Sequence, residues 1–191
     1  LSAASFYIAL ILTTLIILYN GPARKFPGVA FVIMGLCRGF NLLLGASTAI
    51  STSNIAPSII PVFLTETLYI LAVTYIAYNE TKKLPSRMWC MMPFMVAAGG
   101  GLLCISIHSL SSSGFAVFVV FLIMTLLICN SLDKHLPTSQ IPPKIGQLIR
   151  NLMLLQAAFT VMANPDFLWY GLILIALFPI AARVSRSFYS S

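Results

Sequence analysis

The sequence predicts an all-α integral membrane protein, a single domain over residues 1–191 with about seven transmembrane helices. Hydrophobic residues make up 59% of the chain and charged residues only 8%, and the mean hydropathy is +0.97. A soluble domain of this length could not bury so much apolar surface in its own core. The apolar residues form runs of membrane-spanning length, and most of the charged residues lie between the runs.

The predicted spans follow one another through short connections. A helix needs about 20 apolar residues to cross the hydrocarbon core, and the runs that meet or approach this length cover residues 2–19, 27–50, 58–78, 88–108, 115–130, 145–163 and 167–182. The fifth run is short, and residues 164–166 predict a helix-stopping turn between the last two. Gly35 and Gly39 are spaced to let a neighbouring helix approach closely. The three glycines at 99–101 predict either a kink or close packing.

Lysine and arginine segregate to one side of this topology. Nine of the eleven cationic residues lie in alternate connections or near the C-terminus: Arg24, Lys25, Lys82, Lys83, Arg87, Lys134, Lys144, Arg183 and Arg186. The positive-inside rule therefore places the basic loops and the C-terminus on the cytoplasmic, matrix or stromal side, as in a plastid thylakoid or mitochondrial inner membrane. Because no basic run is long enough to follow a phosphate backbone, the net charge of +7 reflects topology and not nucleic-acid binding.

No motif for metal, redox or hydrolytic chemistry is present. The four cysteines stand alone in or beside apolar runs, without CxxC spacing, and are expected to pack as small apolar groups: Cys37, Cys90, Cys104 and Cys129. His108 and His135 fall at opposite membrane faces, so they cannot share a metal ion. The sequence contains no nucleophile elbow, P-loop or HExxH motif.

Two charged residues lie inside predicted spans at matching depths. Arg38 is about eleven residues, or ~16 Å, into the second span, and Glu66 is about eight residues, or ~12 Å, into the third span from the opposite side. An unpaired charge at this depth is very costly, so we expect Arg38 and Glu66 to face each other in the interior. The pair is either purely structural or part of a ligand cavity. Asn41, Gly45 and Thr48 continue the Arg38 face as a polar stripe, which favours a lined cavity.

Several segments carry a resemblance to a known family: residues 18–27 (LYNGPARKFP), 34–45 (MGLCRGFNLLLG), 73–80 (VTYIAYNE), 142–157 and 181–189. The first two combine a tyrosine, a basic pair and a proline with a following Arg-x-x-Asn-x-x-x-Gly helix. They resemble the UbiA superfamily of membrane prenyltransferases, in particular the branch typified by the C protein of the bacterial Ebo operon. The resemblance implies a UbiA-like helical bundle lacking its N-terminal helices, which we expect upstream of Leu1 or on a separate chain.

The chemistry of that family implies what a catalytic site would contain. Its members join an isoprenoid diphosphate to an acceptor, using two aspartate-rich motifs that hold Mg²⁺ and basic side chains that clamp the phosphates. The first motif belongs upstream of Leu1. At the second motif only Glu80 remains, beside Lys82, Lys83 and Arg87, and one carboxylate among three cations is a poor Mg²⁺ site. This basic loop either contacts a diphosphate or an anionic lipid head group, or is a solvated topogenic face.

Two functions are consistent with these residues. The favoured one is a degenerate, non-catalytic UbiA-like relative that serves as a structural or lipid-binding subunit of a larger respiratory or photosynthetic membrane complex. It would need no cofactor, and its partners would be membrane lipids, including an isoprenoid, and other membrane-protein subunits. The alternative is the C-terminal part of an active Mg²⁺-dependent prenyltransferase, in which Arg38, Asn41 and Glu80 line the cavity. The candidate site residues are Arg38, Asn41, Glu66, Glu80, Lys82, Lys83 and Arg87.

Overall fold

The chain folds into helices only. The structure, a computed structural model, describes residues 3–49, 59–80, 84–107, 112–132, 136–163 and 165–189. No strand occurs within these ranges, which confirms the predicted all-α class. In chain order the elements are α1 (Ala3–Asn20), η1 (Pro22–Lys25), α2 (Pro27–Ala49), α3 (Ile59–Tyr78), α4 (Arg87–Cys90), α5 (Met92–Ile107), α6 (Ser112–Ser131), η2 (Thr138–Gln140), α7 (Ile141–Ala163), η3 (Pro165–Phe167) and α8 (Leu168–Tyr189).

Five of the described helices are long and apolar enough to cross a membrane, namely α1, α2, α3, α6 and α7. Two further helices are apolar over shorter stretches, Met92–Ser106 in α5 and Leu168–Ala181 in α8. Large apolar side chains are well exposed on the outside of the bundle, among them Phe6, Ile17, Leu102, Leu127 and Trp169. This combination of length, composition and surface is compatible with a multi-pass membrane protein.

Three helix boundaries differ from the predicted spans for local reasons. The fourth run is divided at Met91 into α4 and α5, next to Pro93, which has no N–H to continue the helical ladder. The α6 helix is 20 residues long and therefore not the short span that was expected. The α7 helix begins at Ile141 instead of residue 145, because Pro142 and Pro143 fit the first turn, where N–H groups have no partner within the helix.

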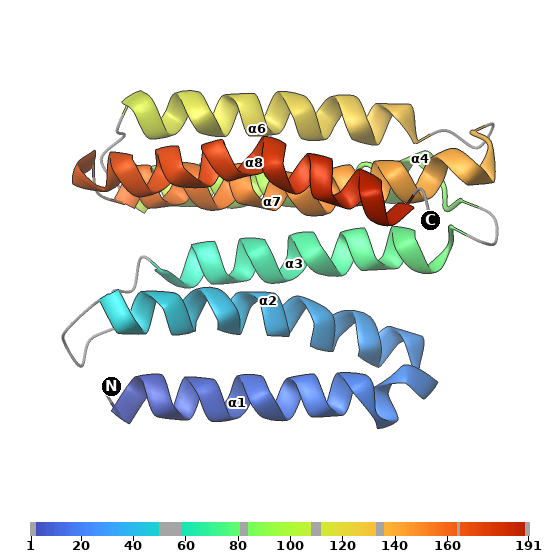
Figure 1. Ribbon diagram of the computed structural model, residues 1–191, viewed down its shortest axis with the longest axis horizontal. Coiled ribbons are helices and arrows are strands. Elements are labelled where there is room, and N and C mark those ends of the chain that lie inside the picture. Colours follow the sequence, from blue (N-terminus) through green and yellow to red (C-terminus); the bar gives the residue numbers. More distant parts are fainter. Residues whose placement is uncertain are drawn as a thin grey trace.

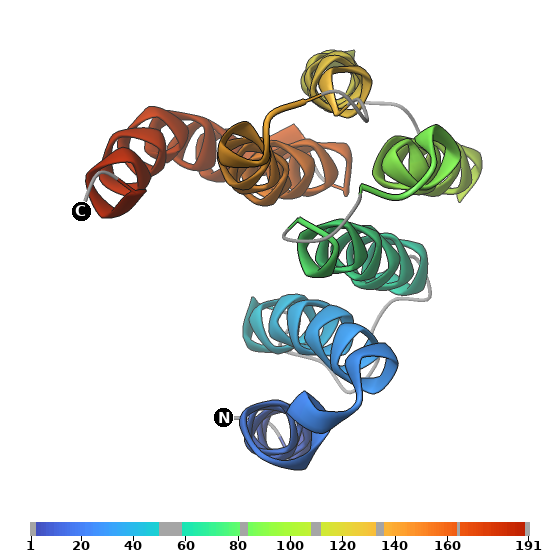
Figure 2. The same ribbon diagram turned by 90° about the vertical axis from the view of Figure 1, so that its right-hand side faces the viewer.

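The helices form a central cluster with two flanks (Figures 1 and 2). The central cluster consists of α3, α5, α6 and α7, which contact one another in the pairs α3–α5, α5–α6, α6–α7 and α3–α7. One flank is the α1–α2 hairpin, which packs on α3 through α2, and the other is α8, which packs on α7. Seen end-on in Figure 2, α1, α2 and α3 lie in a row while α8 extends from the other side of α7.

The core lies inside the central cluster. Tyr69 of α3, Phe121 of α6 and Leu148 of α7 are fully buried, and the Tyr69 hydroxyl donates a hydrogen bond of 2.9 Å to the Leu148 carbonyl oxygen. Phe118 lies 6.0 Å from both Phe121 and Phe159, measured between ring centroids. Aromatic packing and one buried hydrogen bond thus join three of the four central helices.

Small residues allow the closest helix contacts. A Cβ at Gly35 would lie 2.5 Å from the Thr67 carbonyl oxygen of α3, and one at Gly39 would collide with the Thr67 side chain. The predicted close approach at these two glycines is therefore confirmed. In α5, Gly100 packs in the same way against Thr65 of α3, and Gly101 packs against Phe118 of α6. Two of the three glycines therefore serve close packing within a continuous helix.

Candidate functional site

Glu66 of α3 is the one charged residue in the described part of the chain whose side chain is completely buried. The groups that interact with its carboxylate are the Gln156 amide of α7 and the Arg38 guanidinium of α2. Neither carboxylate oxygen has a hydrogen-bond partner of normal geometry. Burying a carboxylate whose oxygens lack hydrogen-bond partners costs free energy. A neighbouring group that donated a hydrogen bond to these oxygens would recover part of that cost.

Arg38 interacts with Glu66 without a direct hydrogen bond. It lies halfway along α2 on the exposed side of the helix, and it acts on Glu66 electrostatically. Because both Glu66 oxygens lack hydrogen-bond partners, the pairing predicted for Arg38 and Glu66 includes no direct hydrogen bond. The reason lies in the α2–α3 contact, where Gly35 and Gly39 face α3 and meet Thr67 directly. The residue next to Gly39 is rotated by about 100° around the helix, which carries Arg38 to the side of this contact.

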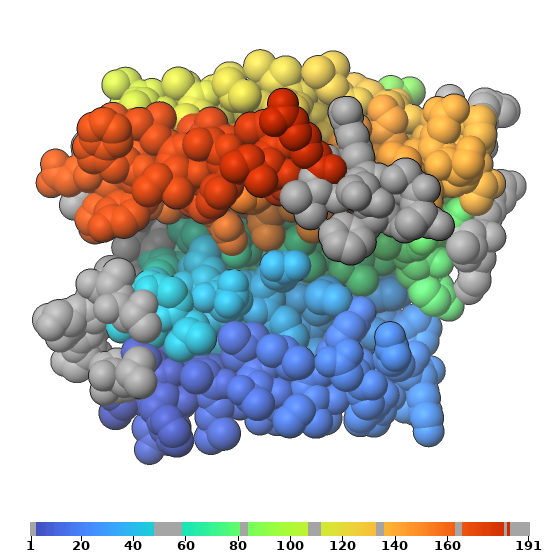
Figure 3. Space-filling view, in the orientation of Figure 1, coloured from blue at the N-terminus to red at the C-terminus, as the bar shows by residue number. Residues whose placement is uncertain are grey.

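A groove runs beside this polar cluster, between the two flanks. Its volume is about 670 Å³, within the range of small-molecule sites. The lining comes from α2, α3, α7, η3 and α8: Leu42, Gly45, Ala46, Ile59, Val62, Gln156, Phe159, Thr160, Phe167, Tyr170 and Leu174. In the space-filling view the surface is hollowed between α8 and α2, with atoms of α3 and α7 visible deeper (Figure 3).

The polar stripe of α2 leads into this groove. Asn41 is exposed and lies one helical turn from Gly45, and Arg38 lies one turn from Leu42. The two candidate residues therefore continue the groove-lining face of α2 toward the basic end of the bundle. The Thr48 side chain lies outside the described residues.

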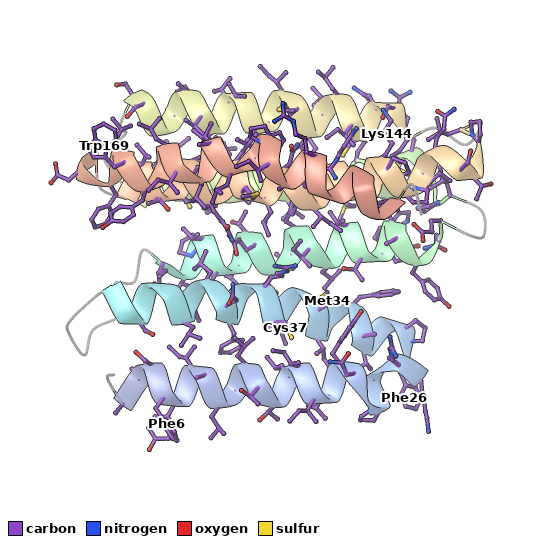
Figure 4. All side chains as sticks on the ribbon, viewed as in Figure 1. Phe6, Phe26, Met34, Cys37, Lys144 and Trp169 are labelled. Carbon is purple, nitrogen blue, oxygen red and sulfur yellow. The ribbon has the colours of Figure 1, made fainter. Side chains whose placement is uncertain are left out.

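The two remaining candidates that the structure describes, Glu80 and Arg87, lie at the opposite end of the helices from the groove. Glu80 follows the last residue of α3, and Arg87 is the first residue of α4, with its guanidinium 3.3 Å from the Asn130 Oδ1 atom of α6. Lys82 and Lys83 lie outside the described residues. In Figure 4, Lys144 and Phe26 appear toward this same end of the bundle, and Trp169 appears at the other end. The structure thus separates Arg38, Asn41 and Glu66 from the basic loop.

No metal centre forms in the part of the chain that the structure describes, which contains no group of three or more His, Cys, Asp or Glu side chains able to hold an ion. Cys90, Cys104 and Cys129 are buried and Cys37 is half-buried, all as free thiols. Both histidines lie outside the described residues. The arrangement around Glu66 can bind a hydrogen-bonding ligand but presents one carboxylate only.

Sequence reasoning missed the contribution of α7. Gln156 and Thr160 line the groove, and Asn151 is buried with its Oδ1 atom unpartnered. The signal was present in the sequence, since Asn151, Gln156 and Thr160 interrupt the sixth predicted span at intervals near one helical turn. Their spacing does not reveal which neighbouring helix they face.

The comparisons with known proteins identify no relative: no family model, no curated protein and no solved structure matches this chain.

Proposed function

We propose that this chain is a seven-span membrane protein that holds a lipid chain in the groove between α2 and α8, as a non-catalytic subunit of a larger membrane complex. The observation that carries the proposal is the groove itself, which is lined mainly by apolar side chains and lies next to buried polar groups. A binding site of this kind requires no metal and no catalytic carboxylate pair.

The shorter apolar helices support seven spans. The α5 helix has 16 residues, equal to about 24 Å, and α4 precedes it with only Met91 between them, so the two helices together approach the ~30 Å thickness of the hydrocarbon core. The α8 helix has 22 residues. The five long helices, together with α5 and α8, alternate in direction and bring the described basic connections to one end of the bundle, which the positive-inside rule places on the cytoplasmic, matrix or stromal side.

The size and position of the groove favour a lipid chain over a transmembrane helix as its occupant. A helix about 10 Å across and 30 Å long occupies about 2,400 Å³, whereas the groove offers about 670 Å³. Its walls are transmembrane helices, so the groove opens sideways toward lipid, and apolar chains can enter it without crossing water.

The resemblance to UbiA proteins supports an isoprenoid as the bound chain. The residues that a family enzyme would use against the diphosphate, Glu80 and Arg87, lie at the other end of the helices from the groove. This separation favours the non-catalytic function over prenyl transfer. The exposed outer faces of α1, α2 and α8 provide surface for neighbouring subunits, and basic groups at one end suit lipid head groups and not nucleic acid.

A pair of glycine substitutions tests the proposal. A Cβ at Gly45, which lines the groove, or at Gly99, which lies outside it, would meet nothing within 4 Å, so a side chain can begin at either position without a clash at its first atom. Gly45→Trp fills the groove and should lower the amount of lipid that remains bound after mild-detergent purification about tenfold, measured by native mass spectrometry. Gly99→Trp is the matched control and should retain the lipid.

The same preparations test the accessory role. Wild-type protein solubilised from its native membrane should migrate with a larger complex on a native gel. Equal lipid retention in both glycine variants would contradict lipid binding in the groove. Migration as an isolated 20.8 kDa chain would contradict the subunit role.

A further inference from the structure

We infer that the groove selects a neutral lipid whose head group is a hydroxyl, and that this head group donates a hydrogen bond to Thr160 and accepts one from Gln156. This inference rests on the proposed function and specifies its ligand. It follows from the balance of donors and acceptors at the inner wall of the groove.

The inner wall presents acceptors. The Thr160 hydroxyl donates its proton to the Gln156 backbone carbonyl over 2.8 Å, so its oxygen faces further partners only as an acceptor. Behind the Gln156 side chain, both oxygens of Glu66 are buried without a hydrogen-bond partner. The two Glu66 oxygens next to the groove therefore lack a donor, and the Thr160 oxygen can accept a hydrogen bond.

The charge at the site disfavours an anionic head group. None of the described lining residues is charged. The one nearby cation, Arg38, acts on Glu66, so the two opposite charges offset each other instead of leaving a positive site. A phosphate or carboxylate head group brings more acceptors, and a negative charge that no described lining residue balances.

A hydroxyl supplies what is missing. It donates one hydrogen bond to Thr160 Oγ1, and it accepts one from the Gln156 NH₂ group. Tyr170, whose hydroxyl can donate or accept, lines the groove from α8. The lipid chain then lies along Leu42, Val62 and Leu174, which are apolar lining residues from three helices.

Photolabelling in phosphatidylcholine nanodiscs tests the inference. The probes are a 20-carbon primary alcohol with a diazirine in its chain, its methyl ether and its phosphate monoester. Cross-linked peptides from α2, α7 and α8 are quantified by mass spectrometry. The alcohol should label the groove about fivefold more than the ether, which is the effect of one net hydrogen bond, and the phosphate should label it least.

Three variants of the protein sharpen the result. Thr160→Val keeps the shape of the side chain and removes the acceptor, so the alcohol and the ether should label it equally. Glu66→Gln adds a donor behind Gln156 and should also reduce the preference for the alcohol. The control is Thr74→Val, because Thr74 makes the same hydrogen bond to its own helix, over 2.7 Å to the Ile70 carbonyl, outside the groove. It should keep the wild-type preference.

The outcomes separate the inference from the proposed function. Equal labelling of wild-type protein by alcohol and ether, or strongest labelling by the phosphate, overturns the hydroxyl inference while lipid binding stands. Unchanged preference in Thr160→Val overturns the assigned contact. Absence of groove labelling by every probe, or groove peptides cross-linked only to another protein, overturns both.

Discussion

In the central cluster, 67% of the residues in an 18-residue apolar stretch of α7 are buried, whereas the corresponding stretches of α1 and α2 in the flank are each 11% buried. Apolar composition runs the other way, because the α7 segment has the lowest mean hydropathy of the five long apolar helices and α1 has a higher one. The buried helix is therefore the more polar helix. Lipid is as apolar as a leucine side chain, so hydropathy alone does not drive a helix into the interior of a membrane protein.

The central cluster and the flanks differ in the contacts that hold their helices together. The central cluster contains aromatic packing, close glycine contacts and buried polar side chains such as Asn151 and Thr125. The flanks contain fewer such features, with the Ser5–Ser47 pair as the buried polar contact described between α1 and α2. We expect substitutions in the central cluster to reduce stability more than chemically identical substitutions on outward-facing positions.

The largest expected effect is from Phe121→Ala in α6. Phe121 is fully buried, and its truncation leaves a cavity that should lower the free energy of unfolding by about 3–5 kcal/mol. Phe115→Ala on the same helix is the matched control, because 42% of the Phe115 surface is exposed and lipid replaces the lost contacts. The measurement is the thermal midpoint of reaction of the buried Cys104 and Cys129 thiols with a fluorogenic maleimide. Equal midpoints for the two variants would show that burial does not determine the cost of truncating a phenylalanine in this helix.

An intermediate effect is expected from Gly114→Leu, also in α6. A Cβ at Gly114 would lie 2.7 Å from the Met162 backbone nitrogen of α7, and backbone cannot move aside without separating the helices. We expect a loss of about 3 kcal/mol, measured by the same thiol assay. Gly99→Leu, where the added atoms meet open space, should change the midpoint little; a similar loss there would attribute the effect to helix propensity instead of packing.

The smallest expected effects come from removing the buried polar pairs. One such pair lies in the central cluster and one lies in the flank. Asn151 Nδ2 donates to Thr125 Oγ1 over 3.3 Å in the central cluster, and Ser47 Oγ donates to Ser5 Oγ over 3.0 Å in the flank. Thr125→Val and Ser47→Ala should each cost about 0.6 kcal/mol, the average for such bonds in membranes.

The position of the reactive cysteine then reports which region loosens. Cys37 lies on the α1 side of α2 in Figure 4, and Cys129 is buried in the central cluster. Hydrogen exchange or thiol labelling below the midpoint should increase at Cys37 in Ser47→Ala and at Cys129 in Thr125→Val. Simultaneous exposure of both cysteines in both variants would show that flank and cluster unfold as one unit.

The sequence predicted the helices well because an apolar run of spanning length has few alternatives in lipid. Helices occupy all seven predicted runs, with the fourth run divided into α4 and α5. The boundaries moved near Pro93 and Pro142, at the start of α6 and at the end of α8. The site was predicted in part. The depth argument selected Glu66, which is buried, together with Arg38, which is exposed. Depth fixes position along the helix axes and not rotation about them. Rotation is set by Gly35 and Gly39 against Thr67, and this packing moves Arg38 to the side. The contribution of Gln156 depends on contact between α3 and α7, which are far apart in sequence.

The groove lies in one half of the bundle, the half farther from the basic loops. A bilayer presents two different lipid populations to a protein, and under the proposed topology a lateral opening at this position would exchange molecules with only one leaflet. Occupancy should then follow the composition of the leaflet opposite the basic loops, regardless of how abundant the same lipid is in the other. A lipid made on the basic side would reach the groove only after flipping across the membrane, which makes bound ligand a reporter of lipid asymmetry.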